Sequence, residues 1–133
     1  MTEENGRTNA VEEANRGDEC LKEARYLLEG GFCNAAVSRA YYAALHWALA
    51  LLLLKGFEPK THRGVIQLLH LHYVEYGTLP TEAAAALGQL ETYRELSDYN
   101  VRADFDAARA AAEIRQAETF ITACRPLLSA ALQ

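Results

Sequence analysis

The stretch SRAYYAALHWALALLLL, residues 38–54, decides the fold of this chain. It places one arginine, two adjacent tyrosines and one histidine in an otherwise apolar run, whose members recur at the three- and four-residue spacing of an α-helix. The run carries two apolar stripes, and each needs a cover, because leaving a large apolar side chain in water forfeits about 1.5–3 kcal/mol. The stretch therefore predicts a core helix covered on two sides, by a helical bundle alone or by a bundle and a second copy of the chain.

Composition extends this prediction to the whole chain of 133 residues, which has the length of one domain. Half of the residues are hydrophobic, only three are proline, and the alternating pattern of a β-strand is absent. Apolar stripes predict helices that begin near residues 18, 34, 61, 81 and 105. We expect an all-α, up-and-down bundle of about five antiparallel helices over residues 18–133, preceded by a flexible N-terminal tail over residues 1–17.

Charge and targeting signals narrow the cellular setting. The formal net charge is −5 and the isoelectric point is near 5.3, so any contact with nucleic acid needs a local basic patch, a dimer groove or a partner. No signal peptide is visible, and the longest apolar run is shorter than the ~18 residues of a membrane span. We expect a cytoplasmic protein without membrane contact.

Cysteine and histidine spacing argues against a cofactor. Cys20, Cys33 and Cys124 are odd in number and widely spaced, which favours buried thiols in a reducing compartment over a disulfide or zinc framework. His70 and His72 lie two residues apart, on different faces of a helix. The sequence contains no phosphate-binding loop and no nucleophile elbow. We therefore expect neither a metal nor a cofactor.

A second distinctive segment, TYRELSDY, covers residues 92–99 at the end of the fourth predicted helix. Asp98 follows Arg94 by four residues, so the two side chains share a helix face and can pair. Two interpretations of Arg94, Asp98 and Tyr99 stay open. They form either a hydrogen-bonded cluster that fixes the helix or a groove that binds a nucleotide, because charged groups within an apolar pattern need a partner or a use.

Three segments follow one another along the chain: EARYLLEGGFCNAAVSRAYYAALHWALALLLLKGFEPKTHRG, then TYRELSDY, then an alanine-rich terminal helix. Together they resemble the HEPN family over about residues 18–128. The resemblance implies a helical bundle that forms a homodimer and is often encoded beside a small nucleotidyltransferase in a toxin–antitoxin pair. It also implies, for the nuclease members, an arginine followed after four to six residues by a histidine, at a dimer groove that cleaves RNA without a metal.

This chain departs from the nuclease pattern. Arg94 matches the motif arginine, but Tyr99 replaces the motif histidine. A phenol with an ordinary pKa near 10 is a poor general base at neutral pH, although it can donate a hydrogen bond or be covalently modified. Arg94 and Tyr99 are the candidate catalytic residues, and whether the chain is a metal-independent endoribonuclease stays open at this point.

Helix residues 38–54 contain a second candidate set, Arg39, Tyr42 and His46. Arg39 and His46 lie two helical turns apart on one face, about 10.5 Å along the axis, so two long side chains could reach one phosphate. The alternative is a core position with satisfied polar tips. Tyr41 and Tyr42 point in different directions, so we expect at most one of them in any single pocket.

Lys60, His62 and Arg63 form the only compact basic cluster, at the start of the third predicted helix. A helix N-terminus favours a phosphate, but we favour a solvated turn here.

The sequence thus predicts a HEPN-domain homodimer that acts with a nucleotidyltransferase-like partner, as the RNA-targeting or nucleotide-binding half of a toxin–antitoxin pair. Asp98, Arg39, Tyr42 and His46 are candidate binding residues beside Arg94 and Tyr99. The alternative is a non-catalytic helical module that binds a nucleotide or a protein.

Overall fold

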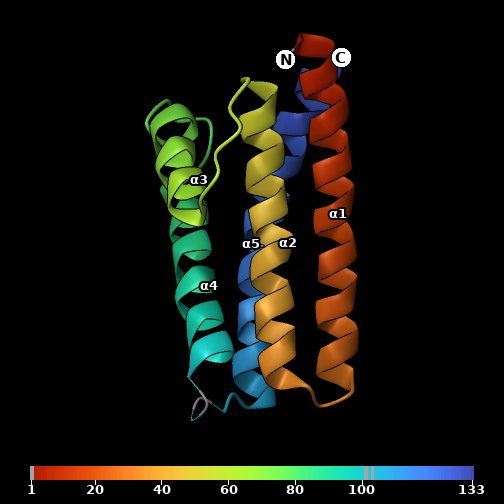
Figure 1. The fold of residues 1–133 in the computed structure, drawn as a ribbon, viewed down its shortest axis with the longest axis vertical. Coiled ribbons are helices and arrows are strands. Elements are labelled where there is room, and N and C mark those ends of the chain that lie inside the picture. The colour runs from red at the N-terminus through yellow and green to blue at the C-terminus, as the bar shows by residue number, and fades with distance from the viewer. Residues whose placement is uncertain (1, 101, 103) are drawn as a thin grey trace.

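The computed structural model describes residues 2–100, 102 and 104–133. Within them the chain forms five α-helices and one short π-helical segment, η1: α1 (Glu3–Glu29), α2 (Cys33–Leu54), α3 (His62–Leu69), η1 (His70–Val74), α4 (Thr81–Tyr99) and α5 (Ala107–Ala131) (Figure 1). No strand occurs in this described part, and the predicted all-α bundle is confirmed. The predicted break at residues 100–104 includes positions 101 and 103, which lie outside the described residues.

The first helix corrects the predicted flexible tail over residues 1–17. α1 begins at Glu3, where the side chain of Thr2 accepts a hydrogen bond from the backbone N–H of Asn5 at 3.1 Å. Its N-terminal half buries a stripe of small residues: Gly6, Ala10, Ala14 and Gly17. Small side chains carry a weak hydrophobic signal but let two helices approach closely, which explains why the pattern alone missed this packing. Met1 lies outside the described residues.

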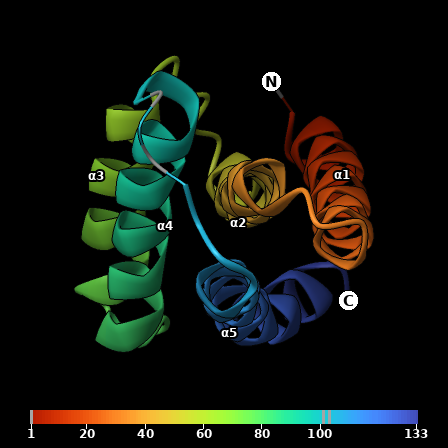
Figure 2. The same cartoon turned by 90° about the horizontal axis from the view of Figure 1, so that it is seen from below.

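Helix α2 lies at the centre of the molecule. It contacts α1, α3, α4 and α5, and Figure 2 shows α1, α5 and the α3–α4 pair on three of its sides. The stripe that contains Tyr41, Ala44 and Ala48 is buried within the chain, whereas the stripe that contains Tyr42 and Leu49 is only partly buried. α2 is long and apolar enough to cross a membrane by length and composition, but 67% of its most apolar window is buried inside the bundle. Burial of this kind is typical of a core helix.

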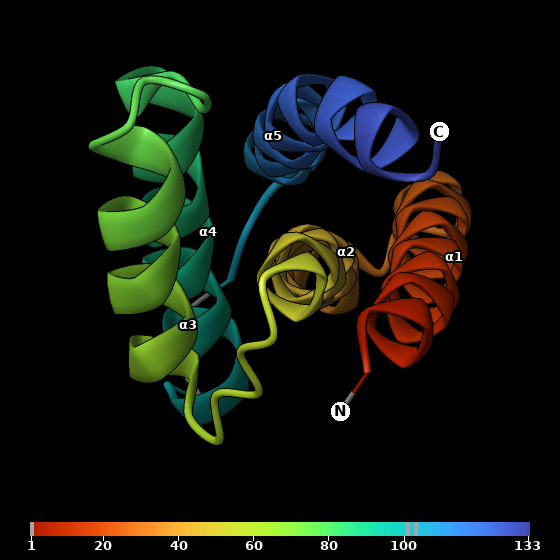
Figure 3. The same ribbon diagram turned by 90° about the horizontal axis from the view of Figure 1, so that it is seen from above.

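Helix α3 departs from strict alternation of direction. The connection after α2 runs back along the bundle, so that α3 rises in the same direction as α2 and α4 returns beside it (Figure 1). The α3–α4 pair is tilted relative to α2 and α5, as the end-on views show (Figures 2 and 3). This arrangement brings the start of α3 to the C-terminal half of α4, where the candidate site lies.

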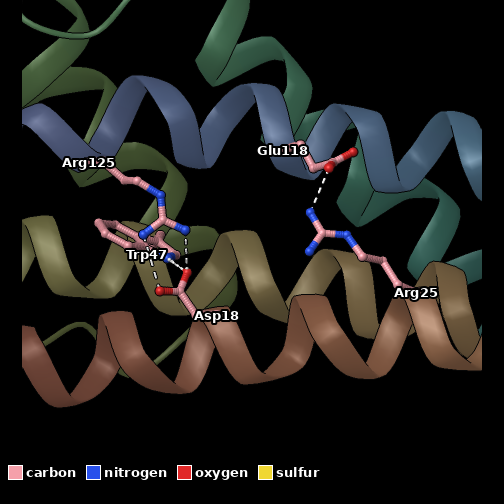
Figure 4. A network of polar contacts seen from close by, with 5 residues as sticks. All are labelled: Asp18, Arg25, Trp47, Glu118 and Arg125. Atoms are coloured by element: carbon pink, nitrogen blue, oxygen red, sulfur yellow. Dashed lines mark hydrogen bonds and ion pairs between the residues drawn. The ribbon is translucent and has the colours of Figure 1, made fainter.

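Polar contacts join α1, α2 and α5 on the side of the bundle away from α3 and α4 (Figure 4). Asp18 of α1 accepts hydrogen bonds from Trp47 Nε1 at 3.0 Å and from Arg125 Nη2 at 2.7 Å. The Arg125 guanidinium also lies over the Trp47 ring, 4.9 Å from its centre. Further along, Arg25 pairs with Glu118 at 2.6 Å. These contacts join α1 to α2 and α5, away from Tyr41, whose ring meets Arg94 of α4.

Candidate functional site

Arg94 is the centre of the candidate site. Its side chain lies in the last turns of α4 and is 6% exposed. Nη2 lies 3.3 Å from Nδ1 of His62, and Nη1 lies 3.6 Å from a carboxylate oxygen of Asp98. The guanidinium also lies over two phenol rings, 5.1 Å from the centre of Tyr41 and 5.8 Å from that of Tyr99. A buried cation thus has one acidic, one imidazole and two aromatic neighbours.

The start of α3 positions His62. Thr61 caps this helix, and its hydroxyl accepts a hydrogen bond from the backbone N–H of Gly64 at 2.9 Å. A Cβ atom at position 64 would lie 3.0 Å from that hydroxyl, so the glycine allows the tight cap. His62 is the first residue of the helix and its side chain is partly buried. The cap therefore fixes the backbone from which the imidazole reaches Arg94.

The end of α4 is tied to the start of α2. The Ser97 hydroxyl donates to the backbone carbonyl of Asn34 at 2.7 Å. The side-chain oxygen of Asn34 accepts from the backbone N–H of Phe105 at 3.0 Å. These bonds hold both sides of the α4–α5 connection against α2, so that Arg94 and Tyr99 sit at a fixed height beside the tyrosines of α2.

Aromatic and cationic groups continue from Arg94 along α2. The rings of Tyr41 and Tyr42 are 5.2 Å apart, and their centres lie 5.6 Å and 6.2 Å from the centre of His62. The Arg39 guanidinium lies 5.0 Å from the Tyr42 ring. Both tyrosines therefore meet one imidazole, and the expectation that at most one would join a single pocket is wrong. They converge because His62 approaches between them from another helix.

Electrostatics keep the arginine charged and the buried phenol neutral. Burial opposes the charged form of Arg94 and so lowers the pKa of its guanidinium. Four neighbours outweigh this effect, and the pKa is raised: Tyr42, Tyr41, Tyr99 and Asp98. Burial raises the pKa of the Tyr41 phenol far above its ordinary value, and the charge of Glu91 adds to the increase. The cluster thus offers a permanent cation beside a hydroxyl that stays protonated.

Two polar atoms of this cluster have no hydrogen-bond partner among the described residues. They are Nε of Arg94 and the hydroxyl of Tyr41, and both are buried. A buried polar group left unpaired costs about 1–3 kcal/mol, so such groups often mark a place that a ligand completes. The unpaired N–H of a cation favours an anionic ligand.

Asp98 and Tyr99 form the outer rim. The Asp98 side chain is 30% exposed, and Tyr99 is 77% exposed. The predicted pairing of Arg94 with Asp98 is present at 3.6 Å. The rim therefore consists of a carboxylate, which pairs with the guanidinium, and a phenol, which is exposed to solvent.

The second predicted set, Arg39, Tyr42 and His46, does not form a single site. Arg39 joins the cluster through Tyr42, and it also lies 3.8 Å from a Glu23 oxygen of α1. The ring of His46 instead pairs with Glu13 of α1, with 2.6 Å between Nδ1 and a carboxylate oxygen. Arg39 and His46 share a face as predicted, but acidic residues of α1 engage both. Their contacts do not bring His46 to Arg94.

His62 and Tyr41 are the members of the cluster that the predicted site lacks. The KTHRG turn was the available signal, but His62 precedes Arg94 by 32 residues, and no local spacing links them. The favoured interpretation of this turn as merely solvated is wrong for His62, whose ring is partly buried against Arg94 and the two tyrosines.

Metal ligands do not gather in the described residues, where no three His, Cys, Asp or Glu side chains lie together.

A second buried charge, Glu113, lies between α4 and α5, where it accepts hydrogen bonds from Gln89 at 3.0 Å and Arg109 at 3.3 Å. It serves the packing of the two helices and is not part of the cluster around Arg94.

Comparison with known proteins gives a consistent result. The sequence profile of the HEPN domain matches residues 11–127. A "UPF0332 protein" of Thermotoga maritima is 32% identical over 85% of this chain and 86% of its own. Two proteins of Methanocaldococcus jannaschii carry the name "Putative toxin": one is 38% identical over 62% of this chain and 61% of its own, the other 25% identical over 85% and 77%.

Proposed function

The chain belongs to the HEPN domain family, and from this membership we propose that it is the toxin-like half of a toxin–antitoxin pair that binds RNA or a nucleotide. The names of the two relatives from Methanocaldococcus jannaschii support the toxin-like role. In this proposal the protein acts in the cytoplasm as a homodimer, with a nucleotidyltransferase-like protein as its partner.

One observation carries the binding proposal: a buried guanidinium keeps an unpaired N–H beside aromatic rings. Arg94 Nε has no partner among the described residues, and Tyr41, Tyr99 and His62 surround the group. A guanidinium binds phosphate with several N–H groups, and exposed aromatic rings stack on bases. Arg94 therefore contacts phosphate, Tyr99 at the rim donates a hydrogen bond or receives a modification, and Tyr42 with Arg39 extends the surface.

A second function has its own support. Asp98 already pairs with Arg94, and Tyr99 stands where the motif histidine would be. Both features favour a non-catalytic module that holds a nucleotide or a protein in the same place. The two functions share Arg94 and differ in whether bound RNA is cleaved.

Binding of a single-stranded oligoribonucleotide and of a nucleotide panel tests the role of Arg94. We expect Arg94→Gln to weaken binding about 10-fold or more, because a hydrogen bond to a charged group contributes about 1.5–3 kcal/mol. Arg94→Lys keeps the charge but loses the planar fork, and should fall between the two. Fluorescence polarisation measures the binding, and circular dichroism confirms that each variant is folded.

The matched control is Arg115→Gln, which removes an exposed arginine of α5 outside the site. It should bind within twofold of the wild type. An equal loss of binding affinity in the Arg94 and Arg115 variants would show that only the total charge of the protein matters. A folded wild-type protein that binds neither RNA nor any nucleotide would refute the proposed function.

A further inference from the structure

The α3–α4 pair, at the edge of the bundle (Figure 3), carries an apolar groove that is open to solvent. Its central pocket has a volume of about 530 Å³ and lies between α4 and the run of α3 and η1. Apolar side chains from both sides form most of the lining: Ile66, Leu69, Leu71, Ala84, Ala85 and Leu87. The pocket shares no side chain with the cluster around Arg94, so it needs an explanation of its own.

The groove is long. A neighbouring pocket shares Leu71 with the central one and reaches Tyr76. Another neighbouring pocket shares Ile66 with it and reaches Glu95. Between Thr81 and Glu95, α4 extends about 21 Å, or about four helical turns, at 1.5 Å per residue. This length suits an extended stretch of secondary structure better than a compact small molecule.

The π-helical segment η1 exposes apolar side chains at one end of the groove. Leu71 lies within η1 and is 48% exposed, and Tyr76, which follows η1, is 76% exposed. Tyr73 of the same segment is buried. Short π-helical turns are frequent at functional sites. Because covering exposed apolar surface is favourable, this end favours an occupant with apolar side chains.

The α4 side of the groove favours a helical occupant. Ala84 and Ala85 line the central pocket, and Gly88 follows one turn later on the same face. A Cβ atom on Gly88 would meet nothing within 4 Å. Such small residues let a second helix approach to the usual axis separation of about 8–10 Å. An extended peptide would need a sheet edge to pair with, and the described part of the chain contains no strand.

Carboxylates dominate the charged groups along the groove. Glu75 lines its apolar part, and Glu91 and Glu95 line its polar end. Among the described lining residues, these three carboxylates face one arginine, Arg63. Charges across an interface are usually complementary, which sets the register and the choice of partner. The groove therefore favours an occupant with basic residues beside its apolar stripe.

We propose that this groove, lined from Tyr76 to Glu95, binds an amphipathic helix of a partner protein. The helix is about four turns long, its apolar residues recur at three- and four-residue spacing and face the groove, and its flanking residues are lysine or arginine. This inference goes beyond the proposed function and does not depend on it, because Arg94 takes no part. It would stand even if the chain bound neither RNA nor a nucleotide.

A fluorescent peptide of 16 residues tests the proposal, with leucine in a helical stripe and lysine elsewhere. We expect the wild type to bind it at least tenfold tighter than two control peptides, one with glutamate in place of lysine and one with the same residues scrambled. Ala85→Arg should weaken binding at least tenfold, because it places a bulky cation in the groove. Ala108→Arg makes the same change at an exposed position of α5 outside the groove, and should bind within twofold of the wild type.

Fluorescence polarisation measures the affinities, and circular dichroism confirms that both variants are folded. Hydrogen exchange locates the peptide, which should slow exchange in α4 over residues 81–95. The proposal would be overturned if the leucine–lysine peptide did not bind, if the scrambled peptide bound as well, or if Ala85→Arg bound like the wild type. It would also be overturned if light scattering showed that Ala85→Arg, but not Ala108→Arg, converts a dimer into a monomer, because a second copy of the chain would then occupy the groove.

Discussion

At the scale of single residues, Asp98 occupies part of the guanidinium to which the proposed anionic ligand would bind. The carboxylate lies 3.6 Å from Arg94 Nη1 and one helical turn away on α4. It neutralises part of the charge that a phosphate would otherwise meet. Under the proposed function, the pair would weaken anion binding while it keeps the buried arginine in place.

Replacing this carboxylate by an amide of the same shape should strengthen anion binding. We expect Asp98→Asn to lower the dissociation constant for RNA or a nucleotide about three- to tenfold, because the phosphate no longer displaces a charged competitor. Fluorescence polarisation at a fixed salt concentration measures the change, since phosphate contacts depend on salt. Weaker binding by a folded Asp98→Asn protein would show that the carboxylate orients Arg94 for its ligand, contrary to this prediction.

At the scale of elements, α1 and α2 approach each other through small residues. A Cβ atom on Gly17 would lie 2.7 Å from Trp47 Cδ1 and 2.8 Å from the backbone carbonyl oxygen of Ala43. Trp47 is held at this position by Asp18 (Figure 4). The contact explains why a glycine occupies the middle of a long helix, where it normally weakens the helix.

Gly17→Ala should therefore destabilise the protein by about 1–2 kcal/mol. Overpacking costs about 1–3 kcal/mol, and the better helix propensity of alanine recovers up to about 1 kcal/mol of that. The control is Gly88→Ala in α4, where an added Cβ meets nothing within 4 Å. In urea unfolding, this control should raise the free energy of unfolding by about 0.5–1 kcal/mol. A stabilised Gly17→Ala protein would contradict the close packing of α1 on α2.

The predicted helices and the described ones agree best where the pattern is strong. The starts near residues 34 and 61 correspond to α2 at Cys33 and α3 at His62. The start expected near residue 81 corresponds to Thr81, the first residue of α4, and Pro80 precedes it without a side-chain cap. The start of α1 was misplaced because its buried face consists of glycine and alanine, which residue periodicity barely registers.

At the scale of the whole molecule, several ionisable side chains are buried in their neutral forms. Burial raises the pKa of the Cys20 and Cys124 thiols and of the Tyr41 and Tyr73 phenols. Above the pKa of each group in the unfolded chain, the folded protein holds more protons than the unfolded one. Stability therefore falls as the pH rises.

The bundle should accordingly lose stability in alkaline solution, first as unfolded thiols ionise near pH 8.5 and then as unfolded phenols ionise near pH 10. Each group removes up to about 1.4 kcal/mol per pH unit above its unfolded pKa. Urea midpoints at pH 8 and pH 10.5 measure the loss, and Tyr41→Phe should reduce it. A midpoint that does not change between these pH values would contradict burial of the neutral groups.

Helix class, the central place of α2 and the Arg94–Asp98 pair follow from residue order alone, because periodicity and contacts one turn apart are local properties of a helix. Three contacts arise only in the folded bundle. His62 contacts Arg94, both Tyr41 and Tyr42 contact His62, and His46 pairs with Glu13. These contacts join residues far apart in sequence, and the packing of α3 and α1 against α2 decides which of them form.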